Sequence, residues 1–194
     1  MLVCSDMSEP ESERRASASN LRTSLIAVNV LGGMAVLASY SLMFEREDAS
    51  AILWGGVPEH LRALYSTNMW LAALGYFPFT GLLVFGADPA RVRFYRGSGF
   101  GLLLVLYAAV MIGSAAWMPL TFAWADSGAF PFWLIRLDLA VVGIASLGLL
   151  GCVATVSPRP VTWIHFLAFF GCVAFCFQTA VLDAAIWPAY YPTP

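Results

Sequence analysis

The sequence predicts an all-α integral membrane protein, a bundle of five transmembrane helices. Of its 194 residues, 60% are hydrophobic and only 11% are charged, whereas an ordinary soluble domain carries about 25% charged residues. A soluble fold of this size could not hide so much apolar surface. The apolar residues also gather in five runs, each of which reaches the roughly 17–25 residues that a helix needs to cross the hydrocarbon core. A water-soluble enzyme and a disordered chain are therefore both excluded.

The predicted spans form one domain, residues 21–194, behind a polar tail. Residues 1–20 are rich in Ser and Glu and have no hydrophobic period, which is typical of a disordered segment. The spans cover residues 23–44, 68–85, 98–120, 132–156 and 161–187. Helices are expected because backbone polar groups must be satisfied internally in lipid, and the alternation of barrel strands is absent.

Each predicted span ends at residues that the bilayer disfavours. Charged residues 45–48 follow the first span, residues 87–89 (Ala-Asp-Pro) follow the second, and residues 125–128 (Ala-Asp-Ser-Gly) follow the third. The fourth ends at residues 157–160, where two prolines cannot continue a helix. Tryptophans stand at the span ends, as an interfacial aromatic belt requires: Trp124, Trp133, Trp163 and Trp187.

The arginines that flank the spans predict the orientation. Seven lie on the side of the N-terminus: Arg14, Arg15, Arg22, Arg91, Arg93, Arg96 and Arg159. Three lie on the opposite side: Arg46, Arg62 and Arg136. Because positive charge favours the cytoplasmic side, we expect a multi-pass protein with its N-terminus in the cytoplasm and its C-terminus on the opposite face.

The longest connection, about residues 45–67, is too apolar for a bare solvated loop. It contains Ile52, Leu53, Trp54 and Val57. We expect a short interfacial helix that lies over the mouth of the bundle, and long structured connections of this kind often act as lids.

The composition argues against catalysis, metal binding and nucleic-acid binding. All ten basic residues are arginine, which excludes a Schiff-base lysine and the lysine of a phosphate-binding loop. The nucleophile elbow, HExxH and CxxC motifs are absent from the sequence, and a net charge of −2 leaves no basic patch for nucleic acid. We expect no catalytic residue, no cofactor and no metal ligand.

Polar residues inside the spans are the best pointers to function, because their insertion into lipid is costly. Asn29, Asp138 and Gln178 lie deep, whereas Asp183 lies near a span end. Asp138 must face the bundle interior, where it either contributes to a cavity or forms a hydrogen bond to another helix.

The third span carries the most specific constellation. Pro119 removes a backbone hydrogen bond and kinks or ends the helix, and Trp117 places a large ring beside it. Phe122 and Trp124 follow. An aromatic helix of this kind next to a buried Asp138 predicts a pocket for a flat apolar ligand with a polar group.

At these residues the chain resembles the TspO/translocator protein family of tryptophan-rich, five-helix membrane proteins. The third span matches at Leu106-Tyr107, Trp117-Met118-Pro119 and Phe122, the fourth at Trp133 through Asp138-Leu139, and the second around Gly75-Tyr76. The family's asparagine and first tryptophan are replaced by Ser114 and Ala115, and only Trp54 and Pro58 remain of its first-loop motif. The resemblance implies a tetrapyrrole- or sterol-like ligand, with Trp117, Pro119, Phe122 and Asp138 in or near the pocket.

We therefore expect a protein that is not an enzyme and that binds a hydrophobic small molecule in an aromatic helical pocket, with Tyr76 contributing a further ring face. The alternative is a structural or assembly subunit of a membrane complex that packs through its fifth helix. That helix has a small residue at every fourth position, a pattern that favours close helix packing: Ala168, Cys172, Cys176, Ala180 and Ala184. Such packing also allows a homodimer, and it explains Cys172 and Cys176 better than metal ligation does.

Overall fold

The computed structural model describes residues 11–128, 130–159 and 161–191 and confirms the all-α fold. Within these residues the chain forms helices and one isolated β-bridge between Arg93 and Ser157, with no strand. The first half contains α1 (Glu11–Ser41), η1 (Leu42–Glu45), α2 (Ala49–Trp54), α3 (Glu59–Gly81), η2 (Leu82–Gly86) and η3 (Tyr95–Gly97). The second half contains α4 (Gly101–Ser127), α5 (Trp133–Thr155), α6 (Thr162–Cys176), η4 (Phe177–Ile186) and α7 (Trp187–Tyr190).

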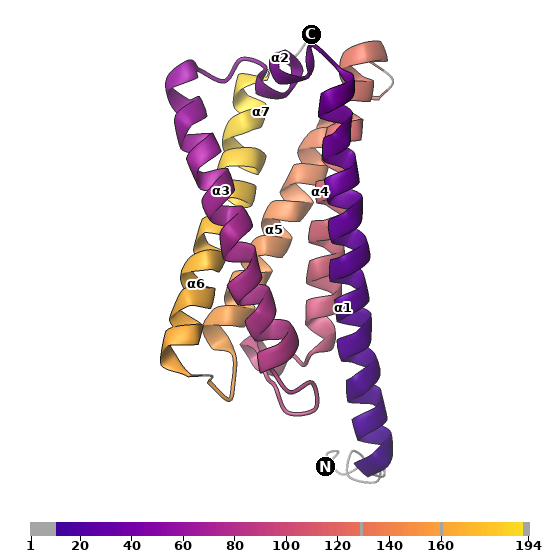
Figure 1. The fold of residues 1–194 in the computed structure, drawn as a ribbon, viewed down its shortest axis with the longest axis vertical. Helices are drawn as coiled ribbons and strands as arrows, with labels where there is room; N and C mark the ends of the chain where they lie inside the picture. Colours follow the sequence, from indigo (N-terminus) through magenta and orange to yellow (C-terminus); the bar gives the residue numbers. More distant parts are fainter. Residues whose placement is uncertain (1–10, 129, 160, 192–194) are drawn as a thin grey trace, which may run out of the picture.

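Five helical segments of this part of the chain are long and apolar enough to cross a membrane. They are Ala16–Glu45, Glu59–Gly86, Gly101–Ser127, Trp133–Thr155 and Trp163–Tyr190. The fold is therefore compatible with a multi-pass membrane protein. Because the number of candidate spans is odd, the described chain starts at one end of the bundle and finishes at the other (Figure 1).

The bundle consists of two helix pairs with α5 between them. Helix α1 packs along α4, and α3 packs along α6, while α5 contacts α4 on one side and α6 with η4 on the other. In Figure 1 the α3–α6 pair and the α1–α4 pair stand on opposite sides of α5. This arrangement keeps α1 and α3 apart over the upper half of the bundle.

Three predicted boundaries need correction. Helix α1 begins at Glu11, so residues 11–20 are helical and not part of a disordered tail, because Glu, Arg and Ala are good helix formers; residues 1–10 lie outside the described part. Helix α3 begins at Glu59 and not near residue 68. Helix α4 continues past Pro119 to Ser127 and ends at Gly128, which has the left-handed φ of 59°.

The expected short helix in the first connection is present as α2. It lies at the top of the bundle, between the ends of α1 and α3 (Figure 1). The indole Nε1 of Trp187 donates a hydrogen bond to the carbonyl of Leu53 at 2.7 Å, and the Tyr191 hydroxyl donates to the carbonyl of Ile52 at 2.8 Å. Both bonds fasten α2 to the C-terminal end of the chain.

The small residues of the fifth span pack inside the chain itself. Ala168, Cys172 and Cys176 are all buried, and the thiol of Cys176 donates to the Ser146 carbonyl of α5 at 3.0 Å. The closest approach lies on the other side, at Gly171, which meets Gly75 of α3 backbone to backbone. Ala168, Cys172 and Cys176 therefore pack inside the bundle, while Ala180 and Ala184 are half-buried.

Candidate functional site

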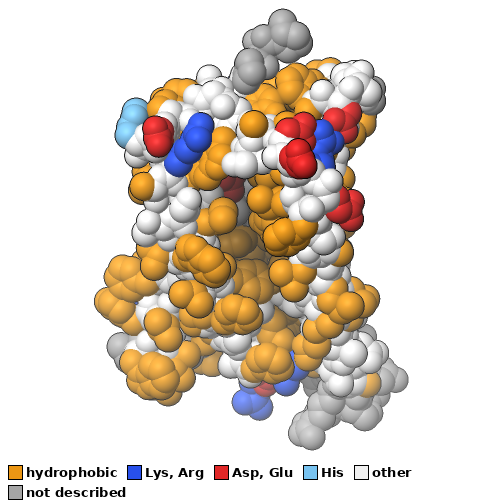
Figure 2. All heavy atoms as spheres, turned by 45° about the horizontal axis from the view of Figure 1, so that its top comes forward, with side chains coloured by type: hydrophobic (Ala, Val, Ile, Leu, Met, Phe, Trp, Pro, Cys, Tyr) orange, Lys and Arg blue, Asp and Glu red, His pale blue; other side chains and the backbone are white. Residues whose placement is uncertain are grey.

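The face between α1 and α3 contains a hollow beneath α2 (Figure 2). An acidic side chain is visible inside this hollow, which is otherwise surrounded mostly by hydrophobic side chains. In the described spans the acidic residues away from the ends are Asp138 of α5 and Asp183 of η4, and both are half-buried. No ion pair joins either of them to an arginine within the described part of the chain. The hollow with its acidic side chain is thus the candidate site. Within the described residues, neither Asp138 nor Asp183 has a cation to balance its charge.

Asp138 faces α4 at Gly113. A Cβ atom on Gly113 would lie 3.1 Å from Asp138 Oδ1 and would also collide with Val142, so this glycine is what lets the carboxyl group approach α4 closely. The other oxygen, Asp138 Oδ2, is buried and accepts no hydrogen bond from the described residues. Buried polar atoms without a partner are rare in proteins, and each one calls for a structural or functional explanation.

Trp117 presents a second unpaired polar atom close by. Its Nε1 is buried and has no acceptor among the residues that the structure describes. Trp117 lies four residues after Gly113, one turn further along the same face of α4. Its ring meets Trp187 edge to face, with the ring centroids 5.9 Å apart. On α4, an unpaired donor on Trp117 thus lies one turn from Gly113, the residue that Asp138 with its unpaired oxygen approaches.

Phe122 closes the site at the level of α2. It is buried together with Met118 and with Ala49, the first residue of α2. The guanidinium of Arg46 stacks on the Phe122 ring, 4.9 Å from its centroid, and donates to Asp126 of α4 at 2.6 Å. The connection above the hollow is therefore fastened to α4 on this side and to Trp187 and Tyr191 on the other.

A polar network on η4 lies beside the hollow. Gln178 donates to Asp183 Oδ1 at 2.9 Å, and Asn68 of α3 donates to Gln178 Oε1 at 3.1 Å. In a regular α-helix, residues five positions apart point about 140° away from each other, but η4 is a π-helix, which brings Gln178 and Asp183 to one side. Segments of π-helix occur frequently at functional sites.

The structure separates two predicted site residues from the others. Tyr76 packs in the lower core with Phe79 and Tyr107, and its hydroxyl donates to Asn29 of α1. It therefore ties α1 to α3 in a different buried cluster from Trp117. Pro119 is exposed.

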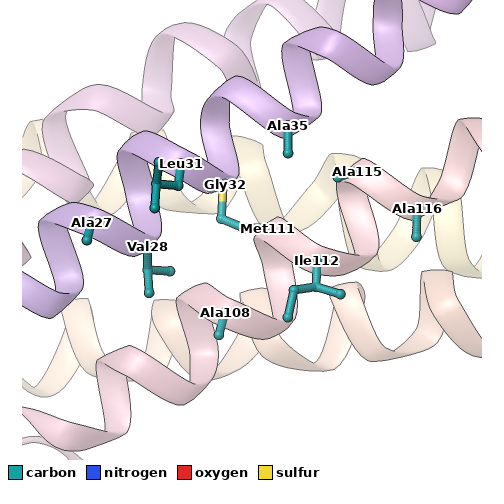
Figure 3. A pocket seen from close by; sticks show the side chains of 10 residues that line it. All are labelled: Ala27, Val28, Leu31, Gly32, Ala35, Ala108, Met111, Ile112, Ala115 and Ala116. Carbon is teal, nitrogen blue, oxygen red and sulfur yellow. The ribbon is translucent and has the colours of Figure 1, made fainter.

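Pro119 lies on the outer face of α4, one and two turns beyond Ala115 and Ile112. Those two residues line a shallow groove of about 590 Å³ between α1 and α4 (Figure 3). Pro119 is therefore exposed and is not brought together with the buried Trp117 Nε1 and Asp138 Oδ2, and its place in or near a pocket stays a prediction. The groove is lined by Gly32 and nine residues with apolar side chains, so it offers no polar side chain that would orient a ligand.

Sequence reasoning missed Asn68 altogether. Asn68 is the first residue of the predicted second span, and an asparagine within a span is costly in lipid, which was the available signal. Asn68 and Gln178 are both buried, each only 7% exposed, which marks them as partners inside the bundle. Asp183 was assigned to a span end, but it belongs to the same network.

Comparison with known proteins leaves the family open, since no family model, no curated protein and no solved structure matches the chain. The resemblance to the TspO/translocator protein family stays a prediction.

Proposed function

We propose that this protein binds a hydrophobic small molecule with a hydroxyl group, of the sterol-like class, in the hollow beneath α2. The hydroxyl bridges Trp117 and Asp138, and the apolar body of the ligand lies against the aromatic side chains of the upper bundle. The observation that carries this proposal is the pair of buried, unpaired atoms, Trp117 Nε1 and Asp138 Oδ2.

A hydroxyl suits this pair because it donates one hydrogen bond and accepts others at the same time. It can donate to the Asp138 oxygen while it accepts from the Trp117 indole. A tetrapyrrole is the other ligand class that the sequence predicts, but its own carboxylates would approach Asp138 and Asp183. Like charges in a low-dielectric site repel one another, which favours the neutral sterol-like ligand.

The test is a titration of the purified protein in detergent with dehydroergosterol, a fluorescent sterol that accepts energy from tryptophan. Trp117→Phe keeps the ring but removes the Nε1 hydrogen. A net hydrogen bond contributes about 0.5–1.5 kcal/mol, so the dissociation constant should rise about two- to tenfold. Asp138→Asn removes the charge from the acceptor and should weaken binding in the same direction.

The matched control is Trp163→Phe, because Trp163 is exposed near the start of the fifth span and should leave the dissociation constant unchanged. Cholestane, a sterol skeleton without the hydroxyl, should compete much less well than cholesterol. Equal competition by the two compounds, together with an unchanged constant in Trp117→Phe, would remove the proposal. Tighter competition by protoporphyrin than by cholesterol would replace the sterol-like class with the tetrapyrrole class.

The assembly alternative was based on the small residues of the fifth span. Ala168, Cys172 and Cys176 are buried within one chain, and Cys176 donates to Ser146 of α5, whereas Ala180 and Ala184 are half-buried. A partner would have to dock elsewhere, and no further observation favours such a surface, so we propose the ligand-binding function alone.

A further inference from the structure

A second pocket lies at the opposite end of the bundle, far from α2. It is formed between the beginning of α1 and the segment that joins η2 to α4, and its volume is about 850 Å³. The α1 wall consists of Ala18, Ser19, Arg22, Thr23 and Ile26, and the other wall runs from Phe85 to Arg91.

Arg22 is the central group of this pocket. Its Nη2 donates to the carbonyl of Ala87 at 2.8 Å, which ties α1 to the connecting segment. Its Nε is buried and has no acceptor in the described part of the chain. A guanidinium carries five N–H donors and binds phosphate oxygens in a fork geometry. Within the described residues, Nη2 is therefore the one nitrogen of this guanidinium that has a hydrogen-bond acceptor.

The side chains beside Arg22 are polar, and those one helical turn further into the span are apolar. Ser19 and Thr23 bring hydroxyl groups into the lining beside Arg22. One turn further into the span the lining is apolar, with Ile26 on α1 and Phe85, which is 70% exposed, on η2. A polar mouth above an apolar wall matches the order of groups in a phospholipid, whose headgroup is followed by acyl chains.

The charges at this end of the bundle are mostly positive. Arg91 lies in the pocket, and Arg93 and Arg96 are exposed in the same connection. The bridge between Arg93 and Ser157 brings Ser157 to this end, and Arg159, two residues further on, is exposed. Figure 2 shows blue side chains at the lower edge of the molecule.

Asp88 is the one acidic side chain of the pocket lining, and its charge is already engaged. Its Oδ1 accepts from the amide of Ala90 at 3.0 Å. Its Oδ2 lies 3.7 Å from Arg91 Nε. The carboxylate therefore does not occupy the unused donor of Arg22.

We infer that this pocket binds the phosphate headgroup of an anionic phospholipid, with Arg22 as the main contact, Thr23 and Ser19 as hydroxyl donors, and an acyl chain along Ile26 and Phe85. The inference is independent of the ligand in the hollow, which lies at the other end of the bundle.

The experiment uses native mass spectrometry of the full chain, released from a neutral detergent that contains phosphatidylglycerol or phosphatidylcholine. We expect one phosphatidylglycerol to be retained in preference to phosphatidylcholine. Arg22→Gln keeps an amide that can still donate to Ala87 but removes the charge. Because a charged hydrogen bond contributes about 1.5–3 kcal/mol, retention should fall about tenfold or more. Thr23→Val, which leaves the net charge unchanged, should lower retention less.

Arg96→Gln is the matched control, because it removes the same charge from the same end but lies outside the pocket lining. Equal losses in Arg22→Gln and Arg96→Gln would show a general surface attraction and would overturn the pocket. Unchanged retention in both Arg22→Gln and Thr23→Val, with melting curves like the wild type, would overturn it too. If inorganic phosphate protects the protein against heat as well as phosphatidylglycerol does, the site takes free phosphate and the lipid assignment fails.

Discussion

Replacing Gly75 by alanine tests how tightly α3 is held against α6. The new Cβ would lie 2.6 Å from the Gly171 Cα atom and 2.7 Å from the Gly171 carbonyl oxygen. Since ordinary contact begins at 3.4 Å, relief of the 2.6 Å contact requires a displacement of about 0.8 Å. Both sides of this contact are backbone, so no side chain can turn away and the helices themselves must separate.

The expected loss of stability follows from that displacement. Overpacking a closely packed interface costs about 1–3 kcal/mol, and a change of 1 kcal/mol moves the melting temperature of a chain of this size by about 2–4 °C. Gly75→Ala should therefore lower the free energy of unfolding, measured by titration with sodium dodecyl sulfate, by about 1–3 kcal/mol. The movement of α3 should also strain the Asn68 hydrogen bond to Ala174 of α6, which is 3.1 Å long.

Gly81→Ala is the control for this measurement. Gly81 ends the same helix, has helical backbone angles and has no atom within 4 Å of an added Cβ. Since alanine favours a helix over glycine by about 0.5–1 kcal/mol, Gly81→Ala should be neutral or stabilising. A Gly75→Ala variant as stable as Gly81→Ala would refute the backbone contact between α3 and α6.

Two further predictions concern the connection above the hollow. Trp187→Phe removes the 2.7 Å hydrogen bond to Leu53, which contributes about 0.5–1.5 kcal/mol; cleavage between residues 46 and 58 by a protease should become faster, and an unchanged rate would contradict the tether. Hydrogen bonds from Arg46 lower the pKa of the Asp48 carboxyl below its ordinary value of 3.8. The ion pair between Arg46 and Asp48 therefore contributes its full stabilisation at pH values above 3.8. This stabilisation is lost as the pH falls through the lowered pKa of Asp48. A ¹³C NMR titration of the Asp48 carboxyl should give a midpoint below 3.8, and Arg46→Gln should raise it; an ordinary midpoint in the wild type would contradict the ion pair.

The number of spans was predictable because hydropathy along the sequence identifies the segments that are long and apolar enough to cross a bilayer. The start of α3 was not, since residues 59–67 mix polar and apolar side chains and continue the helix at the edge of the span. The end of α4 was misjudged at Pro119, because a proline inside a membrane helix is tolerated where neighbouring groups satisfy the freed backbone.

The residues of the candidate site were predictable only in part, because hydropathy does not determine which face of an apolar helix points inward. The sequence singled out Trp117 and Asp138, and the structure places Asp138 against Gly113 of α4, one turn before Trp117. Hydropathy does not fix how a helix turns about its own axis when nearly every face is apolar. For that reason the outward position of Pro119 could not be read from the sequence.

The π-helix η4 could not be predicted either. Its conformation brings Gln178 toward Asp183 while Asn68 binds from α3, so it depends on contacts between residues far apart in the chain. Local patterns contain no information about such contacts.

The most direct test of the central claim is photo-crosslinking with a sterol that carries a diazirine on its ring system, followed by peptide mapping of the adducts. The account predicts adducts in α4 from residue 113 to 122 and in the facing turns of α5, and it predicts that unlabelled cholesterol suppresses them. Adducts confined to the outer groove at residues 27–35 of α1, or adducts in α4 that cholestane suppresses as well as cholesterol does, would contradict it.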